Sequence, residues 1–216
     1  MAEHLNQSDL DVTYLISGRD KQDLFAMEPF GNFEHRSGLT FVTENGKIQK
    51  RKTLQKNNIK QFFSDVKTLD LTGYDLVISD FEPVSAWAAK QQSVDSIGIG
   101  HQYAFSHDIP KEGGTWLTNT LIQKFAPVRF PIGLHWHHFD SPILPPIVDI
   151  KLNSSDIVEN KVLVYLPFEA QSEVINLLSK FKNFDFYIYS PDLENKDNGN
   201  IHTRSPCLKG FKQNLI

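Results

Sequence analysis

The chain has 216 residues, of which 40% are hydrophobic and 12% aromatic, so it can bury a substantial core and is not a disordered polypeptide. Its formal net charge of −4 gives no electrostatic reason to expect nucleic acid as a partner. The one cysteine, Cys207, excludes an internal disulfide framework and a cysteine-rich zinc site.

The sequence predicts a cytoplasmic protein. No apolar run is long enough to cross a bilayer. The opening residues lack the basic and apolar regions of a signal peptide.

The first predicted elements are the end of a helix at residues 2–7 and a strand at residues 12–17. In a doubly wound sheet the first strand and its glycine-containing loop precede the first helix, so we expect the amino-terminal lobe to lack its first strand. Arg19, which follows the predicted strand, is a candidate anion contact. The alternative is an ordinary solvated arginine in a loop.

A basic stretch follows a predicted short helix at residues 21–27 and a predicted strand at residues 39–43. Between Lys47 and Lys60 the chain carries six cations and no acid. Such a run is typical of a solvated helix face or loop, and it also fits attraction to an anionic lipid surface or a phosphorylated acceptor. Peripheral contact at the inner face of the membrane is therefore an open alternative. An amphipathic helix is predicted from the spacing of Ile59, Phe62, Phe63 and Val66.

The stretch from Gly73 to Phe105 predicts a strand, a helix and a second strand, which together form a βαβ unit. Residues 74–79 are a largely apolar run that suits a strand buried on both faces of a parallel sheet. Asp80 is a candidate to cap the following helix, whose first turn tolerates Pro83. Residues 96–100 predict the second strand.

Four polar residues follow these two strands, namely Asp80, Glu82, His101 and Gln102. Ligands bind beyond the carboxyl ends of the strands in an open α/β sheet, so we expect these side chains to meet at one rim. The alternative for Asp80 is a plain helix cap, and for His101 a strand-end histidine bonded to the backbone.

A histidine cluster follows a further predicted helix. Its members are His135, Trp136, His137 and His138. On a strand His135 and His137 project to one face, with Asp140 nearby, which invites a metal interpretation. The sequence names no third ligand, so we interpret these residues as polar side chains of a linker or cleft. Pro145 and Pro146 then predict a domain boundary.

Alternation of strands and helices resumes after the boundary. Strands are predicted at residues 161–166 and 184–189, with a possible third at residues 202–205. The helix between the first two has the apolar positions Val174, Leu177, Leu178 and Phe181. A sheet of two or three strands is too small to stand alone as a doubly wound domain, so we expect this second lobe to be incomplete.

Two Rossmann-like halves joined by a proline-containing linker resemble the GT-B fold of nucleotide-sugar glycosyltransferases. The run YDLVISDFEPVSAWAAK followed by IGIGHQYAF looks like the acceptor-side half of a group of small bacterial and archaeal GT-B proteins. This group is distantly similar to the enzyme that adds N-acetylglucosamine to lipid I. The run VLVYLPFEAQSEVINLLSKF, with YIYSPD and LKGFKQNL, is similar to the opening of the group's donor-side domain.

The resemblance implies an α/β fold of two Rossmann-like lobes that meet across a groove. Residues 1–145 correspond to the acceptor-side domain and residues 146–216 to the start of the donor-side domain. A UDP-linked nucleotide sugar is the expected co-substrate, and the acceptor is a sugar or a lipid-linked molecule. No metal is expected, because GT-B enzymes neutralise the leaving diphosphate with backbone amides and helix dipoles.

Sugar transfer needs a base that takes a proton from the acceptor hydroxyl, and we assign Asp80 and His101 to this catalytic role. The expected acceptor-binding residues are Glu82, Gln102 and Arg19. On the donor side we expect Pro167, Phe168, Glu169, Gly210 and Phe211 to face the cleft. The alternative for each donor-side residue is an ordinary loop or packing role.

The family's amino-terminal glycine-rich loop would precede Met1, and its main donor-binding stretch would follow Ile216. If the 216 residues are the whole molecule, we expect no efficient transfer. Two other functions stay open. One is a non-catalytic module that binds a sugar or nucleotide, and the other is a metal hydrolase centred on the histidine cluster.

Overall fold

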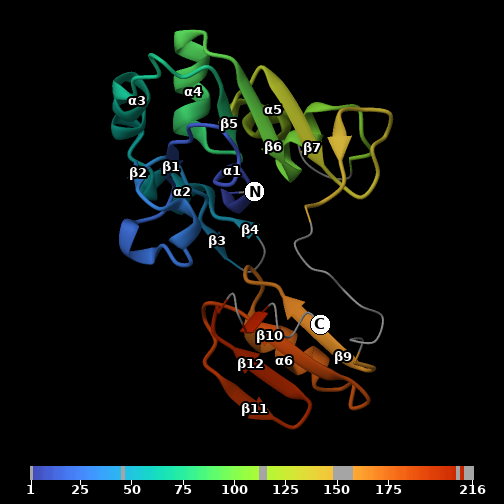
Figure 1. The fold of residues 1–216 in the computed structure, drawn as a ribbon. Helices are drawn as coiled ribbons and strands as arrows, with labels where there is room; N and C mark the ends of the chain where they lie inside the picture. The colour runs from blue at the N-terminus through green and yellow to red at the C-terminus, as the bar shows by residue number, and fades with distance from the viewer. Residues whose placement is uncertain (1, 45–46, 112–115, 148–157, 208–209, 212–216) are drawn as a thin grey trace. The chain divides into compact units, whose positions relative to one another are not determined.

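The computed structural model describes residues 2–44, 47–111, 116–147, 158–207 and 210–211, and the chain divides into two compact units (Figure 1). The first unit contains Met1–Thr40 and Gln55–Val148. The second contains Phe41–Leu54 and Asp149–Ile216. Both units are α/β with parallel strands, as the sequence predicts.

The amino-terminal part of the first unit forms a small parallel sheet of its own. Strand β1 (Tyr14–Ile16) pairs with β2 (Phe33–His35), and Tyr14 lies opposite Phe33. The remaining elements before β2 are short, namely α1 (Ala2–Leu5) and the 3₁₀ turns η1 (Lys21–Asp23) and η2 (Glu28–Phe30). The helix predicted at residues 21–27 is therefore only one turn, and β2 is a strand that the sequence did not predict.

The central sheet of the first unit has four parallel strands in the order β5, β6, β7, β8. They are β5 (Val77–Ser79), β6 (Ser96–Gly100), β7 (Phe130–Leu134) and β8 (Ile143–Leu144). Its helices are α3 (Ile59–Thr68), α4 (Pro83–Gln92), the 3₁₀ helix η3 (His101–Ser106) and α5 (Trp116–Phe125). The βαβ unit predicted between Gly73 and Phe105 is confirmed as β5, α4 and β6. The prediction that its first strand is buried on both faces was wrong, since Ile78 of β5 is exposed.

The core of the first unit lies between α3, α4 and the start of the sheet. Phe62 and Val66 of α3 are buried with Val77 of β5 and Val84 of α4. Leu15 of β1 packs against the same cluster, so the small sheet shares this core. Of the four apolar positions predicted for α3, however, Ile59 and Phe63 are exposed. The side chains that α3 buries are Phe62, Asp65 and Val66, which form a narrower stripe than the four predicted positions.

Small residues allow η3 to lie directly on the sheet. A Cβ on Gly98 of β6 would come within 2.4 Å of Cζ in the Tyr103 ring, and a Cβ on Gly133 of β7 would come within 2.7 Å of the Ala104 Cα. Because real Cβ atoms do not approach other atoms this closely, only glycine fits at either position. This contact fixes the segment that begins at His101.

The second unit contains a four-stranded sheet and a short helix. Its strands are β9 (Lys161–Tyr165), β10 (Asp185–Tyr189), β11 (Lys196–Asn198) and β12 (Ile201–Arg204), in the order β11, β12, β10, β9. All pairs are parallel except β11 with β12. The hairpin pair β3 (Thr43–Glu44) and β4 (Lys47–Ile48) and most of α2 (Lys50–Lys56) also belong to this unit. Strand β11 is a polar segment that the sequence did not predict as a strand.

One face of this sheet packs on α6 (Gln171–Leu178). Phe186 and Ile188 of β10 and Ile201 of β12 are buried against Val174, Ile175 and Leu178. The predicted helix face was partly wrong, since Leu177 and Phe181 are exposed. Helix α6 ends at Leu178, so Phe181 lies beyond the helix and the 3.6-residue period no longer applies to it.

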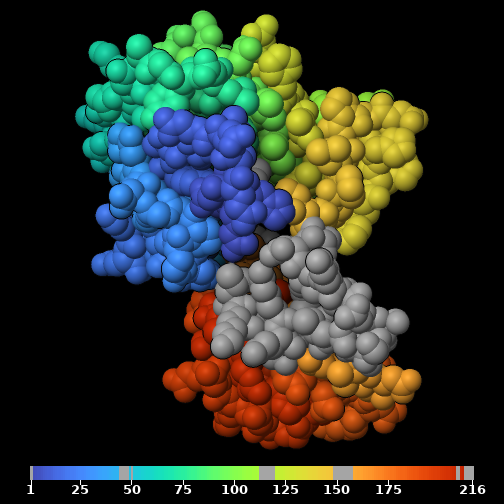
Figure 2. Space-filling view, viewed as in Figure 1, coloured from blue at the N-terminus to red at the C-terminus, as the bar shows by residue number. Residues whose placement is uncertain are grey.

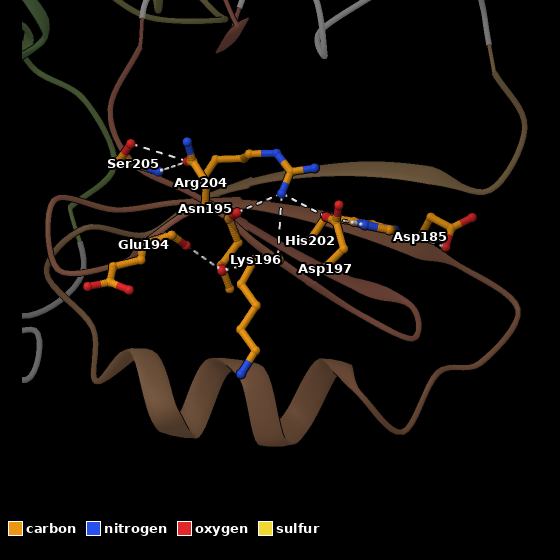
Figure 3. A network of polar contacts seen from close by, with 9 residues as sticks. Asp185, Glu194, Asn195, Lys196, Asp197, His202, Arg204 and Ser205 are labelled. Atoms are coloured by element: carbon orange, nitrogen blue, oxygen red, sulfur yellow. Dashed lines mark hydrogen bonds and ion pairs between the residues drawn. The ribbon is translucent and has the colours of Figure 1, made fainter.

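The opposite face of the sheet carries a polar network (Figure 3). The His202 imidazole lies between two carboxylates, with Nδ1 2.8 Å from Asp197 and Nε2 3.4 Å from Asp185. Arg204 contacts Asp197 at 2.7 Å. The hydrogen bond with Arg204, and to a smaller extent that with His202, holds the pKa of Asp197 below its usual range. The network therefore ties the edge strand β11 to β12 and β10.

Within the part of the chain that the structure describes, no helix is both long and apolar enough to span a membrane.

Candidate active site

The carboxyl ends of three neighbouring strands define one rim of the first unit. Asp80 follows β5, His101 follows β6 and His135 follows β7. The strands are parallel and adjacent, so these residues leave the sheet at the same edge. This is the rim at which the sequence predicted a site.

The turn between β5 and α4 is organised by Glu82. Its carboxylate accepts hydrogen bonds from the backbone N–H of Val84 at 2.8 Å and of Ser85 at 2.7 Å, so Glu82 is the N-cap of α4. The Ser17 hydroxyl, just after β1, donates to the same carboxylate. The prediction that Asp80 caps the helix was therefore wrong. Glu82 instead joins the end of β1 to the start of α4.

Asp80 is left without a capping role. The residue is exposed as a whole, but its carboxyl lies against β6, and Oδ1 is 3.1 Å from the position that a Cβ on Gly100 would occupy. Burial of the carboxyl raises the pKa of Asp80 above its usual range. A carboxylate with a raised pKa is a stronger base than an ordinary aspartate, so this environment suits proton transfer.

Phe81 and Tyr103 hold the turn in place. Phe81 has a φ of 56°, a left-handed conformation that is uncommon for a residue with a side chain. Its ring stacks on Phe125 at 5.0 Å and meets the edge of Tyr103 at 5.6 Å. The Tyr103 hydroxyl lies 3.2 Å from Ser79 Oγ and 3.1 Å from the Ala126 carbonyl. Aromatic packing therefore compensates for the backbone strain at Phe81.

Tyr103 itself is a structural residue. Burial raises its pKa to about 12, and the nearby carboxylates of Asp80 and Glu82 act in the same direction. Its hydroxyl is thus neutral at physiological pH, and it holds Ser79, the last residue of β5, rather than exchanging protons.

His101 is exposed at the rim, and one of its nitrogens has a defined role. Nδ1 lies 3.1 Å from the Leu134 carbonyl, which can only accept a hydrogen bond, so Nδ1 carries the proton. In the neutral ring, Nε2 is then an acceptor. The ring stacks on His135 with centroids 5.9 Å apart and meets the edge of Phe105 at 5.6 Å. His101 is therefore bonded to the backbone through Nδ1, as the alternative interpretation expected. No hydrogen bond among the described residues involves its Nε2.

The two remaining acceptor-side candidates differ in their surroundings. Gln102 and Asp80 both border Gly100, since Gln102 Oε1 is 3.4 Å from the same Cβ position. It also lines a cavity of about 90 Å³ with Phe81 and Tyr103. Arg19 is exposed, its carbonyl accepts a hydrogen bond from His35 Nε2, and no contact among the described residues joins its side chain to Asp80.

The donor-side candidates also gather at the carboxyl edge of a parallel sheet, that of the second unit. Pro167, Phe168 and Glu169 form the turn after β9. The Gln171 side chain braces this turn by donating to the carbonyls of Leu166 at 2.7 Å and Glu169 at 2.9 Å. The Phe168 side chain is exposed. The turn thus presents an aromatic ring to solvent.

Gly210 and Phe211 reach the same edge. The Phe211 ring meets the edge of Tyr165, the last residue of β9, at 5.7 Å and of Tyr189, the last residue of β10, at 5.3 Å. A Cβ on Gly210 would be 3.4 Å from the Tyr189 hydroxyl, an ordinary contact. The two groups of donor-side candidates therefore lie at the carboxyl edge of the same sheet.

The family model described as "Glycosyl transferase family 1" matches the chain over residues 1–216. The chain belongs to this family. It matches no curated protein and no solved structure at a significant level.

Membership of glycosyl transferase family 1 agrees with the two Rossmann-like lobes of the structure, and it supports sugar transfer between a donor and an acceptor.

Sequence reasoning missed three parts of this glycosyltransferase's rim. Ser17 was treated as the end of a strand, although it donates to Glu82 across 65 residues of chain. Tyr103 was not singled out, because no sequence pattern marks a tyrosine that is buried against the turn after β5. His135 was interpreted as a polar side chain of a linker or cleft, with a metal ligand as the alternative, and was not assigned to the rim. Its position at the end of β7, which pairs with β6, places it beside His101.

Proposed function

We propose that this member of glycosyl transferase family 1 transfers a sugar from a UDP-linked donor to a hydroxyl of its acceptor, with Asp80 and His101 as the catalytic residues. The observation that supports this most is the pairing, at one rim, of a carboxyl with a raised pKa and an imidazole whose Nε2 is an acceptor. Either group can take the acceptor's proton as the bond to the sugar forms.

In this proposal Gln102 contacts the acceptor, because it borders Gly100 as Asp80 does. Arg19 contributes a positive charge from the loop after β1. Glu82 has a smaller part than the sequence predicted, since its carboxylate already accepts hydrogen bonds from Ser17 and from the backbone and hydroxyl of Ser85. It positions the start of α4 rather than a substrate hydroxyl.

The donor is proposed to contact the rim of the second unit, at the turn Pro167–Glu169 and at Gly210 and Phe211. The exposed Phe168 ring suits an aromatic or sugar face. Helix α6 starts directly after the turn, and no side chain among the described residues caps it. The Glu173 N–H donates to the Ala170 carbonyl at 2.9 Å, so in this proposal the amides of Gln171 and Ser172 contact the diphosphate. No metal is required in this arrangement. We further propose that the acceptor resembles that of the lipid I N-acetylglucosaminyltransferase, as the sequence runs suggest.

A donor screen tests the proposal. We expect the purified chain, mixed with UDP-, GDP- and TDP-sugars, to show thermal stabilisation by the UDP-linked donors and release of UDP with a suitable acceptor, because binding to the native state raises Tm. Mass spectrometry of the acceptor would detect the added sugar. Binding without any product would favour the non-catalytic module, and stabilisation by none of the donors would contradict the proposal.

We also propose peripheral contact with an anionic membrane through the basic stretch Lys47–Lys60 and the helix α3, which begins at its end. The side chains of Ile59 and Phe63 lie on one face of α3, and both are exposed, at 43% and 56%. Lys60 and Lys67 border this pair on one side, since at about 100° per residue positions 67 and 60 follow 59 and 63 around the helix. The teal atoms of α3 form part of the surface of the first unit (Figure 2). An apolar strip bordered by lysines suits a headgroup region.

Vesicle sedimentation tests this contact. Phe63→Ser is expected to lower partitioning onto phosphatidylglycerol vesicles by about tenfold, because burial of a phenylalanine side chain contributes roughly 1.5–3 kcal/mol. The matched control is Phe25→Ser, which removes another exposed ring from the same unit. Equal partitioning of wild type and Phe63→Ser, or no preference for anionic over zwitterionic vesicles, would refute the proposal.

A further inference from the structure

Three imidazoles of the segment His135–Asp140, which we call the histidine loop, share one hydrogen-bonding pattern. In each, Nδ1 accepts from the backbone N–H two residues further on. His137 N–H donates to His135 at 3.2 Å, Phe139 N–H to His137 at 2.9 Å, and Asp140 N–H to His138 at 2.9 Å. A backbone N–H can only donate, so these contacts indicate that all three Nδ1 atoms are unprotonated. At His138 the Asp140 N–H, at 2.9 Å, is closer to Nδ1 than the Asp140 carboxylate, at 3.5 Å, and the shorter contact decides the tautomer.

This pattern fixes the chemistry of the outer ring nitrogens. A neutral imidazole with a bare Nδ1 carries its proton on Nε2. The histidine loop therefore carries three Nε2–H donors, and no hydrogen bond within the described residues occupies any of them. His101 has the opposite tautomer, because its Nδ1 faces a carbonyl.

The rings form one packed cluster. The Phe139 ring contacts His135, with centroids 5.4 Å apart, and His137, at 4.6 Å, and His137 stacks on His138 at 4.9 Å. Phe139 and Asp140 adopt left-handed φ angles of 50° and 52°, which turn the chain back toward β8. The donors thus come from one short loop whose backbone is held by the imidazoles themselves.

A metal site is a poor fit to this arrangement. A histidine ligates a metal through an unprotonated nitrogen. The unprotonated Nδ1 atoms of the histidine loop are already occupied by backbone N–H groups, and Nε2 carries the proton. The tautomers therefore favour a ligand that accepts hydrogen bonds.

We propose that the histidine loop binds a phosphate group through the Nε2–H donors of His135, His137 and His138. Phosphate oxygens are strong acceptors, and hydrogen bonds to an ionised acceptor are stronger than neutral ones. The stack of His135 on His101 places this site beside the candidate active site. The ligand is a phosphorylated sugar or a nucleotide, and the phosphate chemistry is common to both. The site goes beyond sugar transfer and does not depend on it.

The charge of the loop also predicts a substitution that should strengthen phosphate binding. Asp140 is the one acid of the loop, and its carboxylate lies 3.5 Å from Nδ1 of His138. An anionic ligand is repelled by it, so Asp140→Asn is expected to bind phosphate more tightly than the wild type.

The test is NMR of the imidazole nitrogens in ¹⁵N-labelled protein at about pH 8, above the usual histidine pKa of about 6.5. We expect Nε2–H tautomers for the three loop histidines and Nδ1–H for His101. Titration with inorganic phosphate or pyrophosphate should shift the loop Nε2 signals at millimolar concentration. Glucose 1-phosphate and UDP are then titrated separately. The compound that shifts the signals at the lower concentration identifies the ligand as a phosphorylated sugar or a nucleotide.

Asparagine variants give a matched design. His135→Asn, His137→Asn and His138→Asn each keep a side-chain acceptor near the former Nδ1, so the loop can retain its backbone hydrogen bond, but lose the outer donor. Each is expected to weaken phosphate binding by about tenfold. His4→Asn, on α1, is the control and should leave binding unchanged.

Two results would overturn the inference. The first is Nδ1–H tautomers in the loop histidines, and the second is phosphate binding by the asparagine variants as tight as that of the wild type. If the protein transfers no sugar but phosphate still shifts the loop Nε2 signals, the proposed function is rejected and the phosphate site is supported.

Discussion

Replacement of Asp80 with asparagine is expected to lower the kcat of sugar transfer by about a hundredfold to ten-thousandfold, the range for loss of a catalytic base. Asparagine has the same shape and cannot take a proton. The carboxyl makes no hydrogen bond to another described residue, so the fold should not depend on it. The measurement is kcat with the preferred donor, alongside Tm.

The raised pKa of Asp80 gives this prediction a pH dependence. Only the ionised carboxyl accepts a proton, so the wild-type rate should fall as the pH drops through the raised pKa. Since burial disfavours the ionised form in the folded state, ionisation lowers stability as the pH rises from the usual pKa through the raised one. Asp80→Asn removes that effect, and its Tm at neutral pH should equal or exceed that of the wild type.

A matched control lies five residues earlier. Asp75 is an exposed acid just before β5, and Asp75→Asn should change neither kcat nor Tm. Unchanged turnover in Asp80→Asn would remove Asp80 from the mechanism. A large loss of Tm in that variant would assign it a structural role instead.

Gly98→Ala is expected to destabilise the protein by about 2–4 kcal/mol, one of the largest effects available to a single methyl group. The new Cβ would lie 2.4–2.6 Å from three atoms of the Tyr103 ring. The ring must move, and its hydroxyl then leaves Ser79 and the Ala126 carbonyl. Urea unfolding of the two proteins measures the difference.

A double-mutant cycle shows whether the ring is the cause. In a Tyr103→Leu background the aromatic ring is absent, so Gly98→Ala should cost much less than in the wild type. Equal costs in both backgrounds would mean that the destabilisation arises from the backbone rather than from this contact. Gly210→Ala, where the added Cβ has only an ordinary 3.4 Å contact, is the control with a small effect.

Hydrophobic periodicity predicted the parts of the fold that are long and regular. The unit β5–α4–β6 and the strands β9 and β10 follow from apolar runs and their breaks. The strands β2 and β11 could not be predicted in this way. Phe33-Glu34-His35 and Lys196-Asp197-Asn198 are three-residue segments with no apolar run, and pairing with a distant strand determines them.

The candidate site shows the same limit at the level of single residues. Two acids precede Pro83, and the sequence favoured the first as the helix cap. Proline prefers the first helical position, which makes the residue immediately before it, Glu82, the N-cap. The partner of Glu82 across the fold, Ser17, could not be predicted, because it depends on how β1 packs against the core.

The edge strand β11 has a consequence for the protein's behaviour in solution. Its residues Lys196, Asp197 and Asn198 are all exposed and polar, and it runs antiparallel along the side of a sheet that is otherwise parallel. A charged, very short outer strand is a poor template for a strand from another molecule. It thereby guards the second lobe against aggregation at that border.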